Sequence, residues 1–134
     1  MERYQKAVNI KKSGCNCCEA VCKAYSDIVD INEEDLMKIA SGFGLGLGTM
    51  EGTCGALVGA NIILGLMNNT NIGTTRISKN LVQYFKEECG AVTCKDLKGI
   101  STGKVLCSCD DCVKNASIVL EKTLKEYNIL KEEI

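Results

Sequence analysis

The chain has 134 residues and a formal net charge of −1, and 46% of its residues are hydrophobic. This length suits one domain that buries most of its apolar surface. Ten cysteines occur without any histidine, so Ser–His and Cys–His catalysis are excluded. Acidic and basic residues nearly cancel and form no basic stripe, so we do not expect nucleic acid as a partner.

The first residues contain no apolar signal segment, and a cytosolic location is therefore expected. In the cytosol, dense cysteine more often serves metal binding or redox chemistry than a disulfide framework. The most hydrophobic stretch, residues 52–67, is interpreted as a buried central helix. It is too short to span a membrane, because a helix of about sixteen residues reaches roughly 24 Å against a bilayer core of about 30 Å.

Helical spacing of apolar residues, with glycines between the segments, predicts a compact all-α domain over residues 1–134. We expect about five to six helices around the buried, Gly/Ala-rich central one. In chain order they cover residues 2–13, 16–29, 33–41, 54–66, 75–88 and 109–131, with a single turn at 94–97. The glycine-alternating segment 42–48 is expected to be a connector, because it matches neither a dinucleotide fingerprint nor a Walker motif.

Several cysteines follow a residue that can cap a helix, with an acidic residue three positions after the cap. These pairs are Asn16-Cys17, Thr93-Cys94 and Ser108-Cys109, and Thr53-Cys54 is a fourth case without the acidic residue. Each cysteine is predicted at the first position of its helix. The partial positive charge and free N–H groups of a helix start favour a thiolate there. The pattern therefore predicts several activated sulfurs.

Other cysteines lie close to these in the sequence. Cys15 and Cys18 have the C-x-x-C spacing of redox and metal motifs, and so do Cys109 and Cys112. These thiols are additional candidates for the same chemistry. Cys18 and Cys22 share a helix face, and for Cys22 the role of a small apolar core residue is favoured.

Small residues on the central helix leave room beside it. Gly55 and Gly59 are four residues apart, so another backbone or a bulky cofactor can approach them closely. For the glycines alone, ordinary packing between helices is the simpler interpretation. Cys54 at the head of this helix has space beside its sulfur. Cys89, at the end of the following helix, is interpreted as a buried core residue.

The order of these motifs is specific. They are Gly14-x-Asn16-Cys17, Cys54-Gly55-Ala56-x-x-Gly59, Cys94-x-x-Leu97-x-Gly99 and Cys109-x-x-x-Val113-x-x-Ala116. Together they resemble the C_GCAxxG_C_C family of redox-active proteins over nearly the whole chain. The resemblance implies that Cys17, Cys54, Cys94 and Cys109 are the family cysteines, with Cys112 as an alternative to the last. The other six cysteines either add a second metal or redox site or fill space.

Four sulfurs without histidine suit an iron–sulfur cluster or zinc. We therefore expect a redox or electron-transfer protein whose four family cysteines bind an iron–sulfur cluster, with a separate redox partner protein and no membrane span. Two alternatives stay open. One is a metal-free dithiol/disulfide protein using pairs such as Cys109/Cys112 or Cys15/Cys18, and the other is a structural zinc–thiolate module without turnover. A homo-oligomer is also left open.

Overall fold

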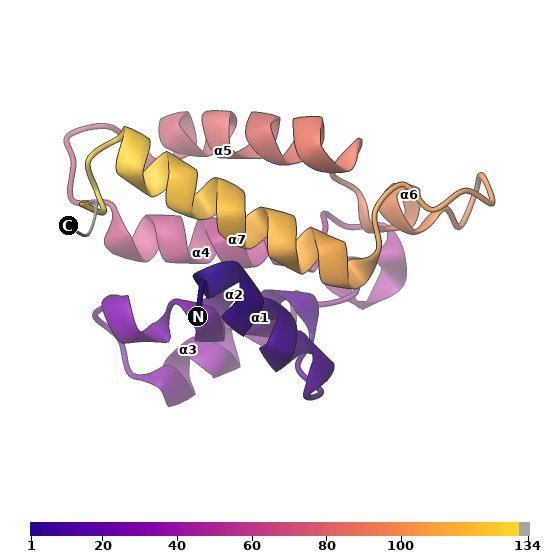
Figure 1. The fold of residues 1–134 in the computed structure, drawn as a ribbon, viewed down its shortest axis with the longest axis horizontal. Coiled ribbons are helices and arrows are strands. Elements are labelled where there is room, and N and C mark those ends of the chain that lie inside the picture. The colour runs from indigo at the N-terminus through magenta and orange to yellow at the C-terminus, as the bar shows by residue number, and fades with distance from the viewer. Residues whose placement is uncertain (132–134) are drawn as a thin grey trace.

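The computed structural model describes residues 1–131 and is all-α within that range (Figure 1). Its α-helices are α1 (Arg3–Lys12), α2 (Cys17–Ala24), α3 (Glu33–Ala40), α4 (Gly55–Met67), α5 (Thr74–Cys89), α6 (Cys94–Lys98) and α7 (Cys109–Glu126). A short 3₁₀ turn, η1 (Ser26–Ile28), follows α2, and an irregular turn, η2 (Gly46–Met50), precedes α4. The all-α prediction is confirmed, with slightly more helices than predicted. No helix in this range combines the length and apolarity needed to cross a bilayer.

Helix α4 is the most apolar helix and packs against α2, α5 and α7, as expected for the central element. Figure 1 shows α5 and α7 running alongside it. Gly59 allows α2 to approach closely, because a Cβ atom at this position would lie 2.8 Å from the carbonyl oxygen of Cys18. Real Cβ atoms do not tolerate that distance. Helix α2 therefore occupies the space beside Gly59, which is the close packing between helices that was the simpler interpretation for the glycines.

Polar contacts join α1 and the end of α2 to the middle of α7. The ring of Tyr25 is fully buried, and its hydroxyl donates to the carbonyl oxygen of Ser117 at 2.9 Å. The guanidinium of Arg3 lies 4.9 Å from the centre of the same ring and pairs with Asp27 at 2.7 Å. A buried hydrogen bond of this kind contributes about 0.5–1.5 kcal/mol. These contacts lie away from the start of α7, where its cysteines are.

Two of the predicted helix caps form. Asn16 accepts a hydrogen bond from the N–H of Glu19 at 2.8 Å, and the Glu19 carboxylate accepts one from the N–H of Asn16 at 2.9 Å. Ser108 accepts one from the N–H of Asp111 at 3.1 Å. The predicted side-chain cap at Thr93 is wrong, because its side chain makes no capping hydrogen bond. Helices α2, α6 and α7 nevertheless begin at the predicted cysteines.

Several boundaries differ from the prediction. Helix α2 ends at Ala24 instead of continuing to residue 29. Cys54 is itself the N-cap of α4, one position before the first helical residue. Helix α7 ends at Glu126 instead of continuing to residue 131. The cause is local, since Asn128 adopts a left-handed φ of 58° and the N–H of Ile129 donates back to the carbonyl oxygen of Leu124 at 2.8 Å.

Candidate functional site

Four helix starts border one cavity of about 150 Å³. Its wall carries Cys17 at the start of α2, Cys54 at the cap of α4, Cys94 at the start of α6 and Cys109 at the start of α7. The four predicted cysteines thus meet at one place. A water molecule occupies about 30 Å³ in the liquid, so a cavity of this size has room for a group of several atoms.

Backbone pairing sets the positions of two of these sulfurs. Thr53 and Thr93 form an isolated antiparallel β-bridge. The N–H of Cys54 donates to the carbonyl oxygen of Val92 at 2.8 Å, so the start of α4 is held against the segment that leads into α6. Cys54 and Cys94 each follow one residue of the bridge. The pairing therefore brings together two cysteines that are far apart in the sequence.

The glycine-rich connector forms another part of the wall. Gly46 has a φ of 55°, and a Cβ atom there would lie 2.5 Å from the Cβ atom of Cys94. The neighbouring Leu45 has a φ of 53° and lines the cavity with its side chain 45% exposed. A left-handed conformation costs a non-glycine residue about 1–2 kcal/mol. The hydrogen bond from the N–H of Met50 to the carbonyl oxygen of Leu45, at 2.9 Å, helps to hold it.

Two lysines that the sequence analysis did not single out also line the cavity, Lys11 of α1 and Lys98 of α6. Burial alone would lower the pKa of Lys98. The hydrogen bond of Lys98 to Cys109 and the nearby Cys94 sulfur together have a larger effect, so the pKa of Lys98 is raised. Lys98 is therefore a cation beside the sulfurs. Its four-residue spacing from Cys94 on one helix is the sequence signal that would have found it.

One pKa shift among the helix-start thiols has the direction that the predicted activation requires. The pKa of Cys54 is lowered by its contact with Cys112 and by the N–H groups of the first turn of α4. Burial opposes this shift but does not reverse it. Burial, together with the neighbouring Cys109 and Cys54 sulfurs, raises the pKa of Cys17 to about 12. Burial also raises the pKa of Cys94 despite the charge of Lys98. For Cys17 and Cys94 the predicted activation is wrong, because the loss of hydration outweighs the helix end.

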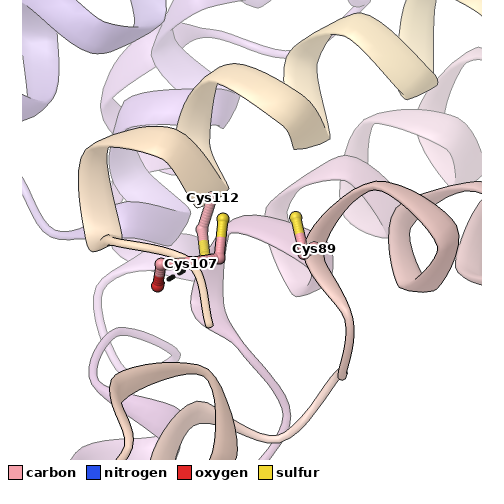
Figure 2. A group of neighbouring side chains, drawn as sticks. All are labelled: Cys89, Cys107 and Cys112. Carbon is pink, nitrogen blue, oxygen red and sulfur yellow. Dashed lines mark hydrogen bonds between the residues drawn. The ribbon is translucent and has the colours of Figure 1, made fainter. Parts of the chain in front are cut away.

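A second group of sulfurs lies next to the cavity, and we call it the triad (Figure 2). The Sγ atoms of Cys89, Cys107 and Cys112 all lie within 4.8 Å of one another, and all three residues are buried. They come from the last residue of α5, the loop before α7 and the first turn of α7 (Figure 2). Cys107 and Cys112 also line the cavity. Within residues 1–131, the triad is the group of potential ligands that is close enough for a single metal ion.

Hydrogen bonds surround the triad. The side-chain amide of Asn115 donates to Sγ of Cys89 at 3.5 Å and to Sγ of Cys107 at 3.9 Å. The Cys112 thiol donates to the carbonyl oxygen of Cys107 at 3.7 Å, the dashed line in Figure 2. The contact with Cys112, helped by Asn115, lowers the pKa of Cys89 to about 6, although burial opposes this. Burial raises the pKa of Cys107 to about 12.

The remaining candidates lie elsewhere. Cys18 and Cys22 are fully buried on α2, and contact with Cys22, together with burial, raises the pKa of Cys18. The Cys22 thiol donates to the carbonyl oxygen of Gly59 at 3.7 Å. Cys15 is half-buried and is not among the residues that line the cavity. Gly55 does line it, and a Cβ atom there would lie 2.7 Å from the carbonyl oxygen of Phe43.

A protein-family model described as "Putative redox-active protein (C_GCAxxG_C_C)" matches residues 15–123. The chain belongs to the C_GCAxxG_C_C family. The resemblance drawn from the motifs is thereby confirmed, and the match spans all ten cysteines. No curated protein and no solved structure matches the chain. Membership in the C_GCAxxG_C_C family places the chain in a redox-active class and specifies neither substrate nor reaction.

Proposed function

We propose that the chain is an electron-transfer protein in which Cys17, Cys54, Cys94 and Cys109 bind an iron–sulfur cluster. The observation that carries this proposal is their arrangement around one cavity of about 150 Å³, each at the start of a different helix. Four thiolates are the common donor set for such clusters. When bound, the cluster would accept and release electrons.

The spacing of these sulfurs supports a cluster over a single ion. Within residues 1–131, no three of the four family cysteines lie within 4.8 Å of one another, whereas the triad sulfurs do. A cluster holds its protein ligands further apart than one ion does, because irons and bridging sulfides lie between them. The volume of the cavity supplies the room for those atoms.

The charges around the cavity also suit a cluster. Four thiolates and an iron–sulfur core carry net negative charge, which is costly to bury without compensation. Lys98 and Lys11 place two cations on the wall. The first N–H groups of α2 and α7 add partial positive charge from the helix ends. Leu45 and Leu97 supply apolar surface that limits contact with water.

Iron and labile sulfide content, with the visible spectrum of protein purified without oxygen, tests this proposal. We expect a coloured protein that loses its iron and sulfide in each of the variants Cys17→Ser, Cys54→Ser, Cys94→Ser and Cys109→Ser. Cys22→Ala is the matched control, since Cys22 is fully buried away from the cavity, and it should retain the cluster. A colourless, iron-free protein that also takes up no reconstituted cluster would contradict the proposal.

One contact favours a metal-free alternative. The Cys17 and Cys109 sulfurs interact across the cavity, from the first residues of α2 and α7. Closing a disulfide there would form one S–S bond and release two electrons and two protons to an oxidised acceptor, such as a partner disulfide. This pair differs from the Cys109/Cys112 and Cys15/Cys18 pairs expected from spacing. Mass spectrometry of alkylated peptides tests this alternative. The alternative requires a linked peptide, containing Cys17 and Cys109, that reversibly loses two hydrogens.

A further inference from the structure

Beyond the proposed cluster, we propose that Cys89, Cys107 and Cys112 form a separate binding site for a single Zn²⁺ ion. The site uses none of the four family cysteines. Its three sulfurs lie within 4.8 Å of one another. With Zn–S bonds of about 2.3 Å, tetrahedral geometry places sulfurs roughly 3.8 Å apart, so small side-chain rotations would bring them into position.

The surroundings of the triad distinguish it from cysteines that fill the core. Asn115 directs its side-chain amide at two of the three sulfurs, at 3.5 and 3.9 Å. An N–H donor stabilises a thiolate that binds a metal, whereas a cysteine that only fills the apolar core does not need such a donor. The other buried pair, on α2, differs, because within residues 1–131 no side-chain amide donates to the sulfur of Cys18 or Cys22. The amide therefore supports a ligand role for the triad.

The donor set indicates the class of metal. Three thiolates favour a soft or borderline ion such as Zn²⁺ over Mg²⁺ or Ca²⁺, which prefer oxygen ligands. Zn²⁺ takes four ligands, and Cys107 and Cys112 line the cavity, so the fourth position faces it. A water molecule from the cavity would complete the tetrahedron. On binding, three Zn–S bonds form and the protons of the thiols leave to solvent.

A metal at this site would also affect the position of a cavity cysteine, because the backbone connects that cysteine to the metal ligands. It would join the end of α5 to the loop before α7 and to the first turn of α7. Cys109 lies between the ligands Cys107 and Cys112 in the sequence, so fixing both would fix the Cys109 backbone. The triad would thus be a positioning site for a cavity cysteine.

Titration with Co²⁺, a spectroscopic substitute for Zn²⁺, tests this in the full chain under a phosphine reductant without oxygen. The background is the triple variant Cys17→Ser/Cys94→Ser/Cys109→Ser, which keeps the triad. We expect one Co²⁺ per chain, with intense sulfur-to-cobalt absorption that Zn²⁺ abolishes by displacement. Because three cluster ligands are already absent, this result is independent of whether the proposed iron–sulfur cluster exists.

Substitutions in that background locate the ion. Cys89→Ala should weaken Co²⁺ binding by more than about 100-fold, and Asn115→Ala, which keeps all three ligands, by about tenfold. Cys22→Ala should leave affinity within about twofold. Far-UV circular dichroism checks that each variant is folded. If Cys89→Ala is unfolded, the Co²⁺ affinity of Asn115→Ala tests the proposal instead. No Co²⁺ binding by the triple variant, or unchanged affinity in both Cys89→Ala and Asn115→Ala, overturns the proposal.

Discussion

The cavity cysteines and the triad are neighbours built from the same side chain, yet they differ in the space around their sulfurs. Cys17, Cys54, Cys94 and Cys109 lie around an open volume of about 150 Å³. The triad sulfurs lie in contact range of one another with a side-chain amide beside them. Helix starts that converge leave room between them, whereas a helix end, a loop and a helical turn pack tightly. This difference is the basis for proposing a polynuclear group in one place and a single ion in the other.

The largest expected effect is a separation of the two metals by single substitutions. Cys94→Ser should remove iron and labile sulfide completely and leave one zinc per chain, while Cys89→Ala should do the reverse. The reason is that Cys94 lines only the cavity and Cys89 belongs only to the triad. Elemental analysis of both variants measures this. If either substitution removes both metals, the two groups form one site.

The second-largest expected effect is the loss of stability when zinc is removed. A ligand held at about 100 times its Kd stabilises the fold by about 2.7 kcal/mol, so a chelator should lower the Tm by several degrees. Cys89→Ala should show no such decrease, because its site is already incomplete. Differential scanning calorimetry with and without chelator measures the shift. An equal shift in both proteins would place the ion outside the triad.

A substitution in the cavity wall should cost stability without removing a sulfur. Gly55→Ala is expected to destabilise the fold by about 1–3 kcal/mol, since its Cβ atom would lie 2.7 Å from the carbonyl oxygen of Phe43. Gly65 on the same helix is exposed, with Thr74 at 3.9 Å as the nearest atom. Gly65→Ala should therefore be neutral or stabilise by up to about 1 kcal/mol. Urea unfolding of the two variants compares them.

A smaller effect concerns charge in the cavity. The cation of Lys98 lowers the pKa of Cys94, so Lys98→Met should raise that pKa and slow alkylation of Cys94 at neutral pH. A partly exposed pair is worth about 0.2–1 kcal/mol, which corresponds to a rate change of up to about fivefold. Lys95→Met, on the same helix but outside the cavity lining, is the control. Mass spectrometry of timed alkylation in the metal-free protein measures both rates.

The smallest effect lies far from both sulfur groups. The hydrogen bond from Arg3 lowers the pKa of Asp27 below its ordinary value of 3.8. The ion pair therefore stabilises the fold fully above that ordinary value, and the contribution disappears as pH falls through the lowered pKa. Asp27→Asn should cost up to about 1 kcal/mol at neutral pH, because the carboxylate is largely exposed, and progressively less as the pH falls through the lowered pKa. Urea unfolding across this range, with unchanged metal content, is the measurement.

Local sequence signals predicted the helices and the four cavity cysteines well. Caps and glycines are short-range features, and the Asn16–Glu19 and Ser108–Asp111 contacts formed as the motifs indicate. The prediction was out of register by one residue at Cys54, because the segment before α4 pairs its backbone with that before α6. That pairing joins residues about forty positions apart, and no local pattern reports it.

The triad was beyond the reach of sequence spacing. Cys107 and Cys112 stand in one short run, but Cys89 carries no local signal and was interpreted as a core residue. Its burial is confirmed, whereas its two sulfur neighbours depend on how the loop folds back. The N–H of Cys107 donates to the carbonyl oxygen of Leu97 at 3.2 Å, which ties the loop before α7 back to α6. The contact among the three triad sulfurs therefore results from tertiary packing and not from a local sequence pattern.

The bridge between Thr53 and Thr93 also bears on biosynthesis. A ribosome would deliver Cys17 and Cys54 well before the segment that carries Cys94 and Cys109. Until that segment emerges, the early thiols have no completed wall around them and are open to adventitious oxidation or wrong partners. Under the proposal, loading of an inorganic group would follow translation of the segment that carries Cys109, which would make maturation a late and separately controllable stage.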